Sequence, residues 1–511
     1  MQQQAVIEIG STGIRMLVVE ITEDKKRNIL DRSELPANIG RDVFTSGVLS
    51  RETMSSCLQI LRRFAEQLKS WGIQPKDTIV LGTSAVREST NRDPFVDRII
   101  IKTGFTVRVI DGLEENRLMY IAVTECLKGA TVDGQDIMQD DSVILEIAGG
   151  TTEMMLIENG RMAGAHSIRL GTVIIEQQVR SIKGGIEDAR SYIEEFIRNS
   201  KSQFNAEMNL DKVKKFIAVG TDMKIASLFT GKSITPFLWQ IQREDFDRFA
   251  DEIQRYSVEE VIAKFKLNYS DAQTFKISLL TYKYFIQLTR ASSIIVPETS
   301  LREGVIITNI ANPSGELQLE FSAQVAASAA ALLRKFQGDE KHAEYVRSMA
   351  LRIYDSMQME LGLPAHTRLL LEIASILHDA GMFIGAKNHN LHSEYIIKNS
   401  EIFGLSRDDI SIVAQIARYH KGTKLPSDDA EFKLLPRETR MTVLKLTSIL
   451  RVADALDRSH RQHLADFTIN FAKDSITFRV KGRNNLNLEK LAIEEKGGLF
   501  ENVFGYKIVL V

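Results

Sequence analysis

Two short turns in the sequence combine glycine with hydroxyl side chains directly after apolar runs. They are Gly10-Ser11-Thr12-Gly13, after residues 6–9, and Gly149-Gly150-Thr151-Thr152, after residues 142–147. Glycine lets the backbone fold back so that successive N–H groups converge on an anion, and the hydroxyls add donors. Each turn follows a carboxylate, Glu8 or Glu146, that can hold a divalent cation directly or through water. One such turn alone fits an ordinary hairpin, but the duplicated pair predicts a clamp for a phosphate chain or a nucleotide tail.

Further charged residues lie near these turns. Glu153 follows the second turn and interrupts an apolar strand, where a carboxylate beside a phosphate can orient or deprotonate water. Glu114 and Glu115 open a predicted helix, where negative charge is also favoured simply by the helix dipole. Three arginines near the turns could neutralise a polyanion or form ordinary surface ion pairs: Arg15, Arg87 and Arg169.

The histidines are concentrated in the second half of the chain. His166 is alone before residue 342, and the other eight of the nine lie between residues 342 and 463. His378-Asp379 ends an apolar helical run, and such a pair can bind a divalent metal when His and Asp from other helices join it. The set resembles the HD-domain metal phosphohydrolases and comprises His342, His378, Asp379 and Asp454. It would form a second hydrolytic centre or hold a structural metal.

Other histidines of this region are assigned by their positions. His392 and His420 are placed like the additional histidines of two-metal HD proteins. Ordinary capping or core roles are expected for the remaining three considered, which are His366, His460 and His463.

The elements that must position these residues form a repeated α/β region and then a helical one. Residues 5–20 are predicted as strand, tight turn and strand, and residues 142–157 repeat that pattern. We interpret this as a weak internal duplication of a βββαβα-type unit, followed by a linker at 311–315 and a helix-periodic stretch over 320–460. Strand-like alternation returns from residue 466. The predicted domains are therefore 1–125, 126–310, 311–465 and 466–511, the last a small α+β cap.

The composition excludes several classes of protein. A chain of 511 residues implies about three or four domains, and 44% apolar with 26% charged residues is typical of a folded globular protein. The net charge of −2 gives no general attraction to nucleic acid or to an anionic membrane, so any polyanion site must be local. Cys57 and Cys126 cannot form a disulfide framework. With no signal-like start and no long apolar run, we expect a cytoplasmic protein without nucleic-acid or membrane partners.

Seven motifs, in order over residues 5–310, resemble the exopolyphosphatase and guanosine pentaphosphate phosphohydrolase (Ppx/GppA) family of the actin-like ATPase superfamily. The motifs are Ile7-Glu8-Ile9-Gly10-Ser11 with Arg15-Met16, Gly82-Thr83-Ser84-Ala85-Val86-Arg87-Glu88 with Asn91, Gly112-Leu113-Glu114-Glu115-Asn116-Arg117-Leu118, Glu146-Ile147-Ala148-Gly149-Gly150-Thr151-Thr152-Glu153, Ser167-Ile168-Arg169-Leu170-Gly171, Ala218-Val219-Gly220-Thr221 and Leu301-Arg302-Glu303-Gly304.

The resemblance implies duplicated actin-like (ribonuclease H-like) α/β domains, followed by an all-α HD-type domain and the small cap. It implies removal of the terminal phosphate from linear polyphosphate or guanosine pentaphosphate, with Mg²⁺. The water-activating glutamate of the family falls on Glu115 and its second catalytic glutamate on Glu153. Its phosphate-binding turns fall on Gly10-Ser11 and Gly149-Gly150-Thr151, and its basic residue near the phosphate path falls on Arg87. From their own positions, Thr12 is expected to add a phosphate contact, and Glu8 and Glu146 are the expected ligands of Mg²⁺.

Some positions depart from the family pattern. Glu8 and Glu146 stand where the family usually has Asp, Ala148 where it has Gly, and Thr151 where it has Ser. The added methylene moves each carboxylate toward the phosphate, so the metal preference or the rate is expected to differ. Ala148 requires a backbone conformation that alanine can adopt without strain.

Several functions stay open at this level. An active enzyme is expected, and the helical region suggests a channel for an extended substrate, which favours polyphosphate over guanosine pentaphosphate. A non-catalytic sensor of polyphosphate or guanosine alarmones is the first alternative. The second is a nucleotide phosphohydrolase that acts through the His/Asp set, with its own divalent metal. Because members of the family often form dimers, we also expect a homodimer.

Overall fold

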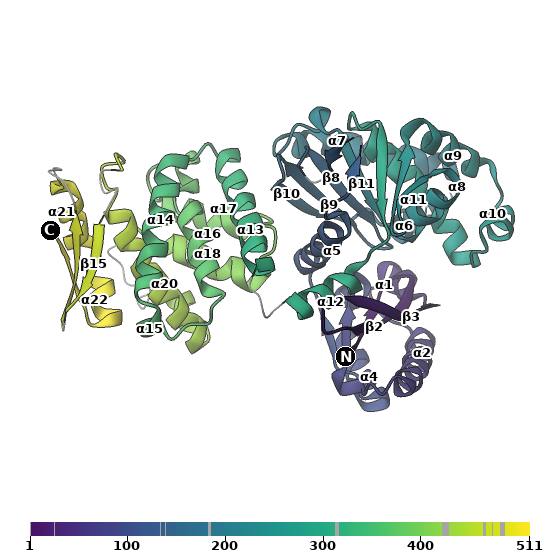
Figure 1. The fold of residues 1–511 in the computed structure, drawn as a ribbon, viewed down its shortest axis with the longest axis horizontal. Coiled ribbons are helices and arrows are strands. Elements are labelled where there is room, and N and C mark those ends of the chain that lie inside the picture. Colours follow the sequence, from purple (N-terminus) through teal and green to yellow (C-terminus); the bar gives the residue numbers. More distant parts are fainter. Residues whose placement is uncertain are drawn as a thin grey trace. The chain divides into compact units, whose positions relative to one another are not determined.

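The chain folds into two compact units, unit 1 (Met1–Leu319) and unit 2 (Glu320–Val511), which are coloured along the sequence in Figure 1. The computed structural model describes residues 2–24, 26–132, 134–137, 139–181, 185–311, 316–421, 429–462, 467–472, 474–480 and 486–511. Residues 312–315 of the predicted linker and His463 lie outside the described residues.

Lobe I of unit 1 is built on a five-stranded sheet in the order β3-β2-β1-β4-β5. Its central strand β1 pairs antiparallel with β2 and parallel with β4, and its apolar residues are buried because helices cover both faces. The strands are β1 (Gln2–Ile9), β2 (Gly13–Ile21), β3 (Arg27–Pro36), β4 (Ile79–Gly82) and β5 (Val107–Val109). The helices are α1 (Ile39–Ser46), α2 (Arg51–Ser70), a 3₁₀ turn at Pro75–Asp77, α3 (Ser84–Glu88), α4 (Arg92–Thr103) and α5 (Gly112–Leu127).

Lobe II contains a seven-stranded sheet in the order β10-β9-β8-β11-β14-β13-β12. Its strands are β8 (Ser142–Ile147), β9 (Thr152–Glu158), β10 (Arg161–Ile168), β11 (Lys215–Val219), β12 (Lys232–Thr235), β13 (Leu238–Gln242) and β14 (Ser293–Pro297). Its helices are α6 (Thr172–Ser181), α7 (Ile186–Asn205), a 3₁₀ turn at Leu210–Lys212, α8 (Thr221–Thr230), α9 (Arg243–Arg255), α10 (Val258–Phe265) and α11 (Tyr269–Gln287). A short hairpin, β6 (Thr131–Val132) with β7 (Gln135–Asp136), precedes the lobe.

The two lobes repeat one topology. In lobe I, β2 pairs antiparallel with β1 and β3 pairs antiparallel with β2, while β4 pairs parallel with β1 and β5 pairs parallel with β4 on the other side. In lobe II, β9 pairs antiparallel with β8 and β10 pairs antiparallel with β9, while β11 pairs parallel with β8 and β14 pairs parallel with β11. Strands β13 and β12 extend the second copy at its edge. The internal duplication predicted from the two turns is therefore confirmed.

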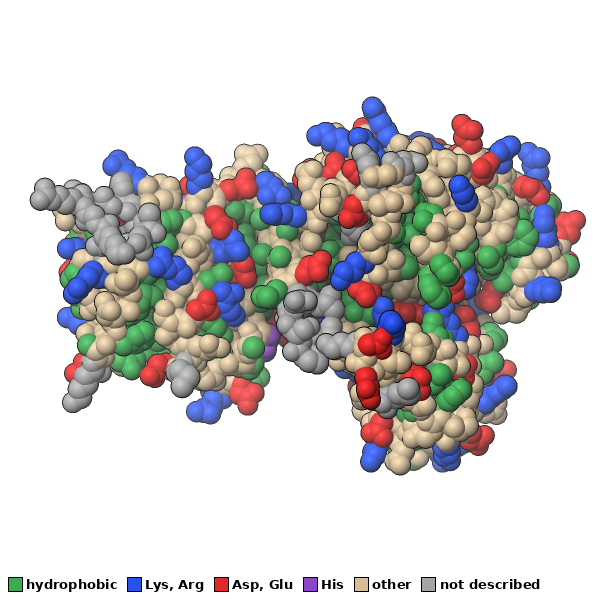
Figure 2. Space-filling model, viewed as in Figure 1, with side chains coloured by type: hydrophobic (Ala, Val, Ile, Leu, Met, Phe, Trp, Pro, Cys, Tyr) green, Lys and Arg blue, Asp and Glu red, His purple; other side chains and the backbone are tan. Residues whose placement is uncertain are grey.

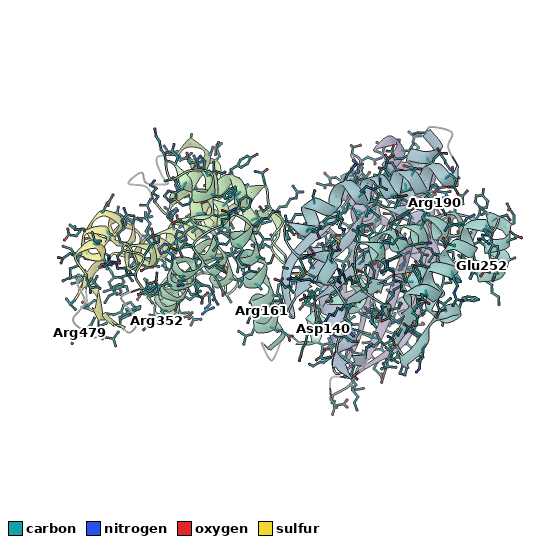
Figure 3. All side chains as sticks on the ribbon, turned by 90° about the horizontal axis from the view of Figure 1, so that it is seen from above. Asp140, Arg161, Arg190, Glu252, Arg352 and Arg479 are labelled. Atoms are coloured by element: carbon teal, nitrogen blue, oxygen red, sulfur yellow. The ribbon has the colours of Figure 1, made fainter. Side chains whose placement is uncertain are left out.

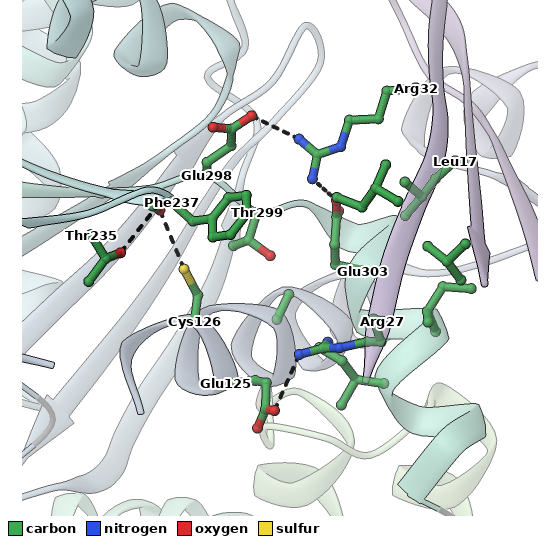
Figure 4. Close-up of a pocket in the computed structure, with 15 residues that line it drawn as sticks. Leu17, Arg27, Arg32, Glu125, Cys126, Thr235, Phe237, Glu298, Thr299 and Glu303 are labelled. Atoms are coloured by element: carbon green, nitrogen blue, oxygen red, sulfur yellow. Dashed lines mark hydrogen bonds and ion pairs between the residues drawn. The ribbon is translucent and has the colours of Figure 1, made fainter. Parts of the chain in front are cut away.

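Helices α5 and α12 (Leu301–Ala311) pack against each other where the lobes meet (Figure 1). Near them lies a cavity of about 260 Å³ lined from both lobes (Figure 4). Arg32 of lobe I pairs there with Glu298 and Glu303, at 2.9 and 2.6 Å, and Arg27 pairs with Glu125 at 3.3 Å. Residues of both lobes line this cavity, and none of the site residues predicted from the sequence does. We therefore assign the cavity to the interface between the lobes.

Unit 2 is helical with a small sheet near its C-terminal end. The helices that carry its buried centre, α14, α16, α18 and α20, pack pairwise against one another. The helices are α13 (Glu316–Lys335), α14 (Glu340–Ser356), α15 (Gln358–Leu361), α16 (Thr367–Leu377), a 3₁₀ turn at Ala380–Phe383, α17 (His389–Lys398), α18 (Arg407–Tyr419), α19 (Ala430–Leu434), α20 (Arg437–Ala455), α21 (Asn487–Lys496) and α22 (Gly498–Phe504). The sheet comprises β15 (Phe467–Phe471), β16 (Ser475–Val480) and β17 (Lys507–Leu510).

The small sheet is attached to the helices through side-chain contacts. Arg352 of α14, labelled in Figure 3, stacks on the ring of Phe467 at 3.9 Å and donates to its carbonyl oxygen at 2.7 Å. A guanidinium over an aromatic face gains both packing and electrostatic attraction. The first strand of the sheet is thereby fixed to α14.

Basic and acidic side chains are interspersed over the visible face of each unit in Figure 2. This pattern agrees with the net charge of −2, since no single basic surface is seen on that face. Among the described residues, no helix has the length and apolarity needed to cross a membrane.

Tyr282 of α11 ties two central strands of lobe II together. Its buried hydroxyl accepts from the Ile147 backbone nitrogen at 3.1 Å and donates to the Val219 carbonyl oxygen at 2.5 Å. The substitution Tyr282→Phe leaves both backbone groups without this partner. It should lower the free energy of unfolding by about 1–3 kcal/mol, measured by denaturant titration.

Tyr284 of the same helix provides the matched control, because its hydroxyl bonds only partly buried Glu194 at 3.2 Å. The substitution Tyr284→Phe should change the free energy of unfolding by no more than about 0.5 kcal/mol. Equal losses in the two variants would contradict the structural role of Tyr282.

Candidate functional site

The two glycine and hydroxyl turns are closed by the same hydrogen bond. Gly10 N donates to Gly13 O at 2.9 Å, and Ala148 N donates to Thr151 O at 2.9 Å, so Ala148 takes the position of Gly10. Ala148 is not among the described residues with positive φ. Alanine is therefore accommodated at this turn without backbone strain.

The two turns lie against each other, as the sequence predicted. A β-carbon built on Gly149 would come within 2.8 Å of Ser11 Cβ, and one on Gly150 within 3.0 Å of Ser84 Oγ. The hydroxyls of Ser11 and Ser84 are 3.2 Å apart. Glycine is thus required at both positions for close approach, and the Phe44 ring lies nearest to Gly150, 2.4 Å from the β-carbon built there.

Glu8, before the first turn, faces two arginines. Its Oε1 lies 3.5 Å from Arg15 Nη1, and its Oε2 lies 3.5 Å from Arg302 Nε. Arg15 also donates to Thr12 Oγ1 at 3.1 Å and to Glu34 at 2.7 Å. Arg302 lies on α12, more than 290 residues after Glu8 in the sequence, and the fold brings the two side chains together. These guanidinium groups hold positive charge beside the turn.

Glu115 lies in the first turn of α5, whose N-cap Asp111 accepts from Glu114 N at 2.8 Å. Arg87 of α3 donates to Glu115 Oε1 at 2.5 Å and to the Ile110 carbonyl oxygen at 2.6 Å. Burial raises the pKa of Glu115 to about 7, although the charge and the hydrogen bond of Arg87 act in the opposite direction. This carboxyl can therefore accept a proton near neutral pH.

Glu153 of β9 is fully buried and held by two donors. Ser167 Oγ donates to its Oε1 at 2.7 Å, and Asn116 Nδ2 donates to its Oε2 at 2.9 Å. Burial and the charge of Glu115 raise the pKa of Glu153 well above its ordinary value, against the effect of its hydrogen bonds. Because Asn116 follows Glu115 directly on α5, Glu153 is connected to the helix turn that carries Glu115.

Glu146 completes a set that we call the glutamate cluster: Glu8, Glu115, Glu146 and Glu153. Burial raises the pKa of Glu146 to about 8, and repulsion from Glu8 and Glu115 adds to the rise while Arg15 and Arg302 oppose it. Within the described residues of unit 1, no three His, Cys, Asp or Glu ligand atoms lie within 4.8 Å of one another. A cation here would have one or two carboxylates as ligands, with water or phosphate oxygens completing its shell.

Arg169, the third arginine predicted beside the turns, has another partner. Its Nη2 lies 3.3 Å from Glu88 Oε2, and the side chain is largely exposed. The structure therefore brings together Arg15, Arg87 and the glutamates, while Arg169 forms a surface ion pair.

The His/Asp set of unit 2 also converges. His342 Nε2 lies 3.5 Å from Asp454 Oδ1, and His378 Nε2 lies 3.7 Å from Asp379 Oδ2. Two groups in the described chain bring potential metal ligands within 4.8 Å: His342 with His378 and Asp379, and Asp379 with His389 and His420. His392 belongs to neither group, and the neighbouring His389 stands there instead.

The remaining histidines have the positions expected of structural residues. His366 is the exposed N-cap of α16, and His460 stacks on His342 with ring centroids 3.8 Å apart. Asp454 is also engaged by Lys496 of α21, whose ammonium contacts its Oδ2.

Sequence reasoning missed several residues that the structure places at these centres. Asn116, Ser167 and Arg302 all lie within the quoted motifs, so motif membership was the available signal. His389 and Lys496 had no such signal, because their positions depend on how separate helices pack.

Comparison with known proteins gives a family for most of the chain. Residues 17–312 match the model of the Ppx/GppA phosphatase family, and residues 326–495 match the model of Ppx/GppA phosphatase, domain III. The second match spans the region for which an HD-type domain was expected, and the HD-type assignment remains a prediction.

Curated relatives match nearly the whole chain at low identity. A guanosine-5'-triphosphate,3'-diphosphate pyrophosphatase of Aeromonas hydrophila is 24% identical over 492 residues, covering 93% of this chain and 91% of the relative. The protein of the same name from Vibrio vulnificus is 21% identical over 509 residues, covering 96% and 95%.

A solved exopolyphosphatase from Cytophaga hutchinsonii matches with a TM-score of 0.54 and 19% identity, covering 61% of this chain and 98% of that one. At this identity the likeness shows a shared fold. Together with the repeated sheet topology, it supports the predicted actin-like α/β architecture.

The raised pKa of Glu146 predicts how the free energy of unfolding changes with pH. The folded protein holds this proton up to about pH 8, whereas the carboxyl's ordinary pKa is 4.5, so the stabilising contribution is present at low pH and is lost as the pH rises through about 8. The substitution Glu146→Gln removes that loss. Without divalent cations, it should raise the free energy of unfolding at pH 8.5 by about 1–2 kcal/mol, allowing for partial exposure.

The measurement is thermal or denaturant unfolding of both proteins at pH 5 and pH 8.5 in the presence of EDTA. The gain should shrink at pH 5, where the wild-type carboxyl is protonated. A gain that is equal at both pH values would sink this account of Glu146.

Proposed function

The chain belongs to the Ppx/GppA phosphatase family, and on that premise we propose that it is a phosphoanhydride hydrolase that releases terminal orthophosphate from inorganic polyphosphate. The observation that carries the proposal is Glu115, a carboxyl with a pKa of about 7 held by Arg87 at the start of α5. A group that exchanges a proton near neutral pH is suited to act as a general base.

In the proposed reaction, water attacks the terminal phosphorus and Glu115 accepts the proton that the water loses. The bridging P–O bond breaks, and orthophosphate and a chain shorter by one phosphate leave. Such a transition state needs in-line positioning and neutralisation of charge more than covalent help from the protein. Arg15 and Arg302, beside the first turn, supply fixed positive charge for this purpose.

Mg²⁺ is the cofactor that we propose for the glutamate cluster. Glu8, Glu115 and Glu146 repel one another, and this repulsion contributes to the raised pKa values of Glu115 and Glu146. A phosphate chain would add further negative charge, so a divalent cation fits the excess, with Glu8 and Glu146 as its protein ligands. When bound, Mg²⁺ would neutralise charge on the phosphate oxygens and help orient them.

We assign Glu153 to positioning. Both of its oxygens are occupied by Ser167 and Asn116, and its pKa lies well above the ordinary value. A carboxyl whose two oxygens both accept hydrogen bonds from fixed donors has little freedom to move toward a metal or a water molecule. Its contact with Asn116 instead fixes the orientation of the α5 turn on which Glu115 lies.

Guanosine pentaphosphate is the second substrate that we propose to test. It also presents a terminal phosphate on an anionic chain, and the two curated relatives are guanosine-5'-triphosphate,3'-diphosphate pyrophosphatases. The length of the chain and its helical unit 2 favour polyphosphate as the main substrate. Binding without hydrolysis, or hydrolysis through the His/Asp set, are the competing functions.

The substitution Glu115→Gln should lower phosphate release from polyphosphate by about 10²–10⁴-fold, because the general base is lost while the shape of the side chain is kept. Orthophosphate is measured with polyphosphate and with guanosine pentaphosphate as separate substrates. Glu114→Gln is the matched control, since Glu114 is the adjacent acid on α5 and pairs with exposed Arg108 at 2.6 Å.

Asp379→Asn, in unit 2, should leave the release of phosphate unchanged. Tight binding of polyphosphate by the wild type without any release would instead identify a sensor. Loss of activity in Asp379→Asn but not in Glu115→Gln would assign the reaction to unit 2.

The pH profile of the same reaction tests the Arg87–Glu115 pair. Activity of the wild type should rise with pH through a midpoint near 7, as Glu115 loses its proton. Arg87 lowers the pKa of Glu115, so Arg87→Gln should move the midpoint upward by about one to three pH units. An unchanged midpoint in kcat/KM would contradict the assignment of Glu115 as the base.

A further inference from the structure

The cavity at the interface between the two lobes of unit 1 takes no part in the proposed reaction. We infer that it binds a small, neutral aromatic molecule, and that its occupation is transmitted to the glutamate cluster through α5 and α12. Its volume is about 260 Å³. A cavity of about 150 Å³ can hold benzene, so a bicyclic ring fits here. The inference does not rest on the proposed activity, because binding in this cavity requires none of the proposed catalytic groups.

The walls of the cavity combine buried apolar side chains with two exposed ones. Leu17 of β2, Ala122 of α5 and Ile306 of α12 are each 1% exposed. Ile29 of β3 and Phe237, between β12 and β13, also line the cavity and are 44% and 52% exposed. The Phe237 ring offers an edge or a face on which a planar ring can pack. A ring that fills the cavity removes this apolar surface from water, which favours binding.

The charged side chains of the cavity already compensate one another. The five that line it form the ion pairs of Figure 4, which are Arg32 with Glu298 and Glu303, and Arg27 with Glu125. Lys224 also contacts Glu298, so two arginines and one lysine balance three carboxylates. A charged ligand would have to displace one of these partners and leave another group uncompensated, which is costly away from bulk water. The lining therefore favours a neutral ligand.

Thr299 offers the ligand one hydrogen-bonding group. It lies between β14 and α12 and lines the cavity, and its hydroxyl makes no hydrogen bond within the part of the chain that the structure describes. A hydroxyl can accept a hydrogen bond from a ring N–H or donate one to a ring acceptor. A neutral bicyclic ring with one such group therefore matches the cavity in size and in polarity. Indole is the simplest probe with these properties.

Helix α12 joins the cavity to the first glycine and hydroxyl turn. Its residue Arg302 lies 3.5 Å from Glu8, and the next residue, Glu303, pairs with Arg32 in the cavity wall. Ile306, about one helical turn further on, lines the cavity as well. A ligand that packs against this helix therefore acts on the same element that places Arg302 beside Glu8.

Helix α5 joins the same cavity to Glu115. Its first turn carries Glu115, and its last turn carries Cys126, which lines the cavity. The two helices cross in close contact, because a β-carbon on Gly304 of α12 would overlap the Leu118 carbonyl oxygen of α5. A shift of one helix therefore presses directly on the backbone of the other. The crossed pair connects the cavity with the glutamate cluster.

The experiment titrates indole into the full-length protein and follows binding by isothermal titration calorimetry and ligand-observed NMR. Wild type should bind one equivalent of indole. Phe237→Ala removes the aromatic wall and should weaken binding by about tenfold. Thr299→Val keeps the shape of the side chain but removes the hydroxyl, so it should weaken binding by about three- to tenfold.

The matched control is Phe229→Ala. Phe229 of α8 is also 52% exposed but does not line the cavity, so this variant should bind indole as wild type does. Equal affinities in wild type, Phe237→Ala and Thr299→Val would overturn the site, as would a wild type that does not bind indole. Equal binding of indole and of the anion indole-3-carboxylate would overturn its preference for a neutral ligand.

Transmission to the glutamate cluster is measured by amide hydrogen exchange, which requires no catalytic turnover. Saturating indole should slow exchange in residues 114–118, near the start of α5, because the bound ring holds the other end of this helix against α12. The same indole concentration should leave the exchange of Phe237→Ala unchanged. Exchange that slows in wild type only at residues lining the cavity would overturn the coupling.

Discussion

Carboxylates brought together away from water repel one another, and much of unit 1 is arranged around that repulsion. Burial and mutual charge raise the pKa of Glu115 to about 7 and that of Glu146 to about 8. Arg15 and Arg302 flank Glu8, and Arg87 holds Glu115, so these two carboxylates each have a guanidinium close to them. The remaining negative charge is what the proposed cation would balance.

The histidine centre of unit 2 meets the same constraint with different chemistry. Its acids are already compensated: Lys496 contacts Asp454, and His342 donates from Nδ1 to Asp457. The Nε2 atoms of His389 and His420 both lie close to the same oxygen of Asp379, at 3.2 and 3.3 Å. Oxygen-rich and nitrogen-rich sites select different divalent ions.

The sequence predicts those features that follow from local pattern. Apolar strands broken by glycine and hydroxyl turns indicated the duplicated lobes, and the repeated sheet order confirms them. The positions of Glu8 and Glu146 before the turns were equally local. The position of Arg302 beside Glu8 depends on α12 returning to the first lobe, and that of His389 depends on the close packing allowed by Gly381. Such contacts join residues whose spacing in the sequence follows neither a helix nor a strand period. The hydrophobic pattern of the sequence therefore does not reveal them.

The first turn of α5 is the point at which both lobes act on Glu115. From lobe I, Arg87 bonds the carboxyl itself and Asp111 caps the helix. From lobe II, Glu153 bonds Asn116, the next residue, and a β-carbon on Gly112 would lie 2.8 Å from Ser167 Oγ. A displacement of one lobe against the other would pull on this turn from both directions. The hydrogen bond and charge of Arg87 lower the pKa of Glu115, while the bond of Glu153 to Asn116 holds the same helix turn from lobe II, so the two lobes together fix where the proposed base lies.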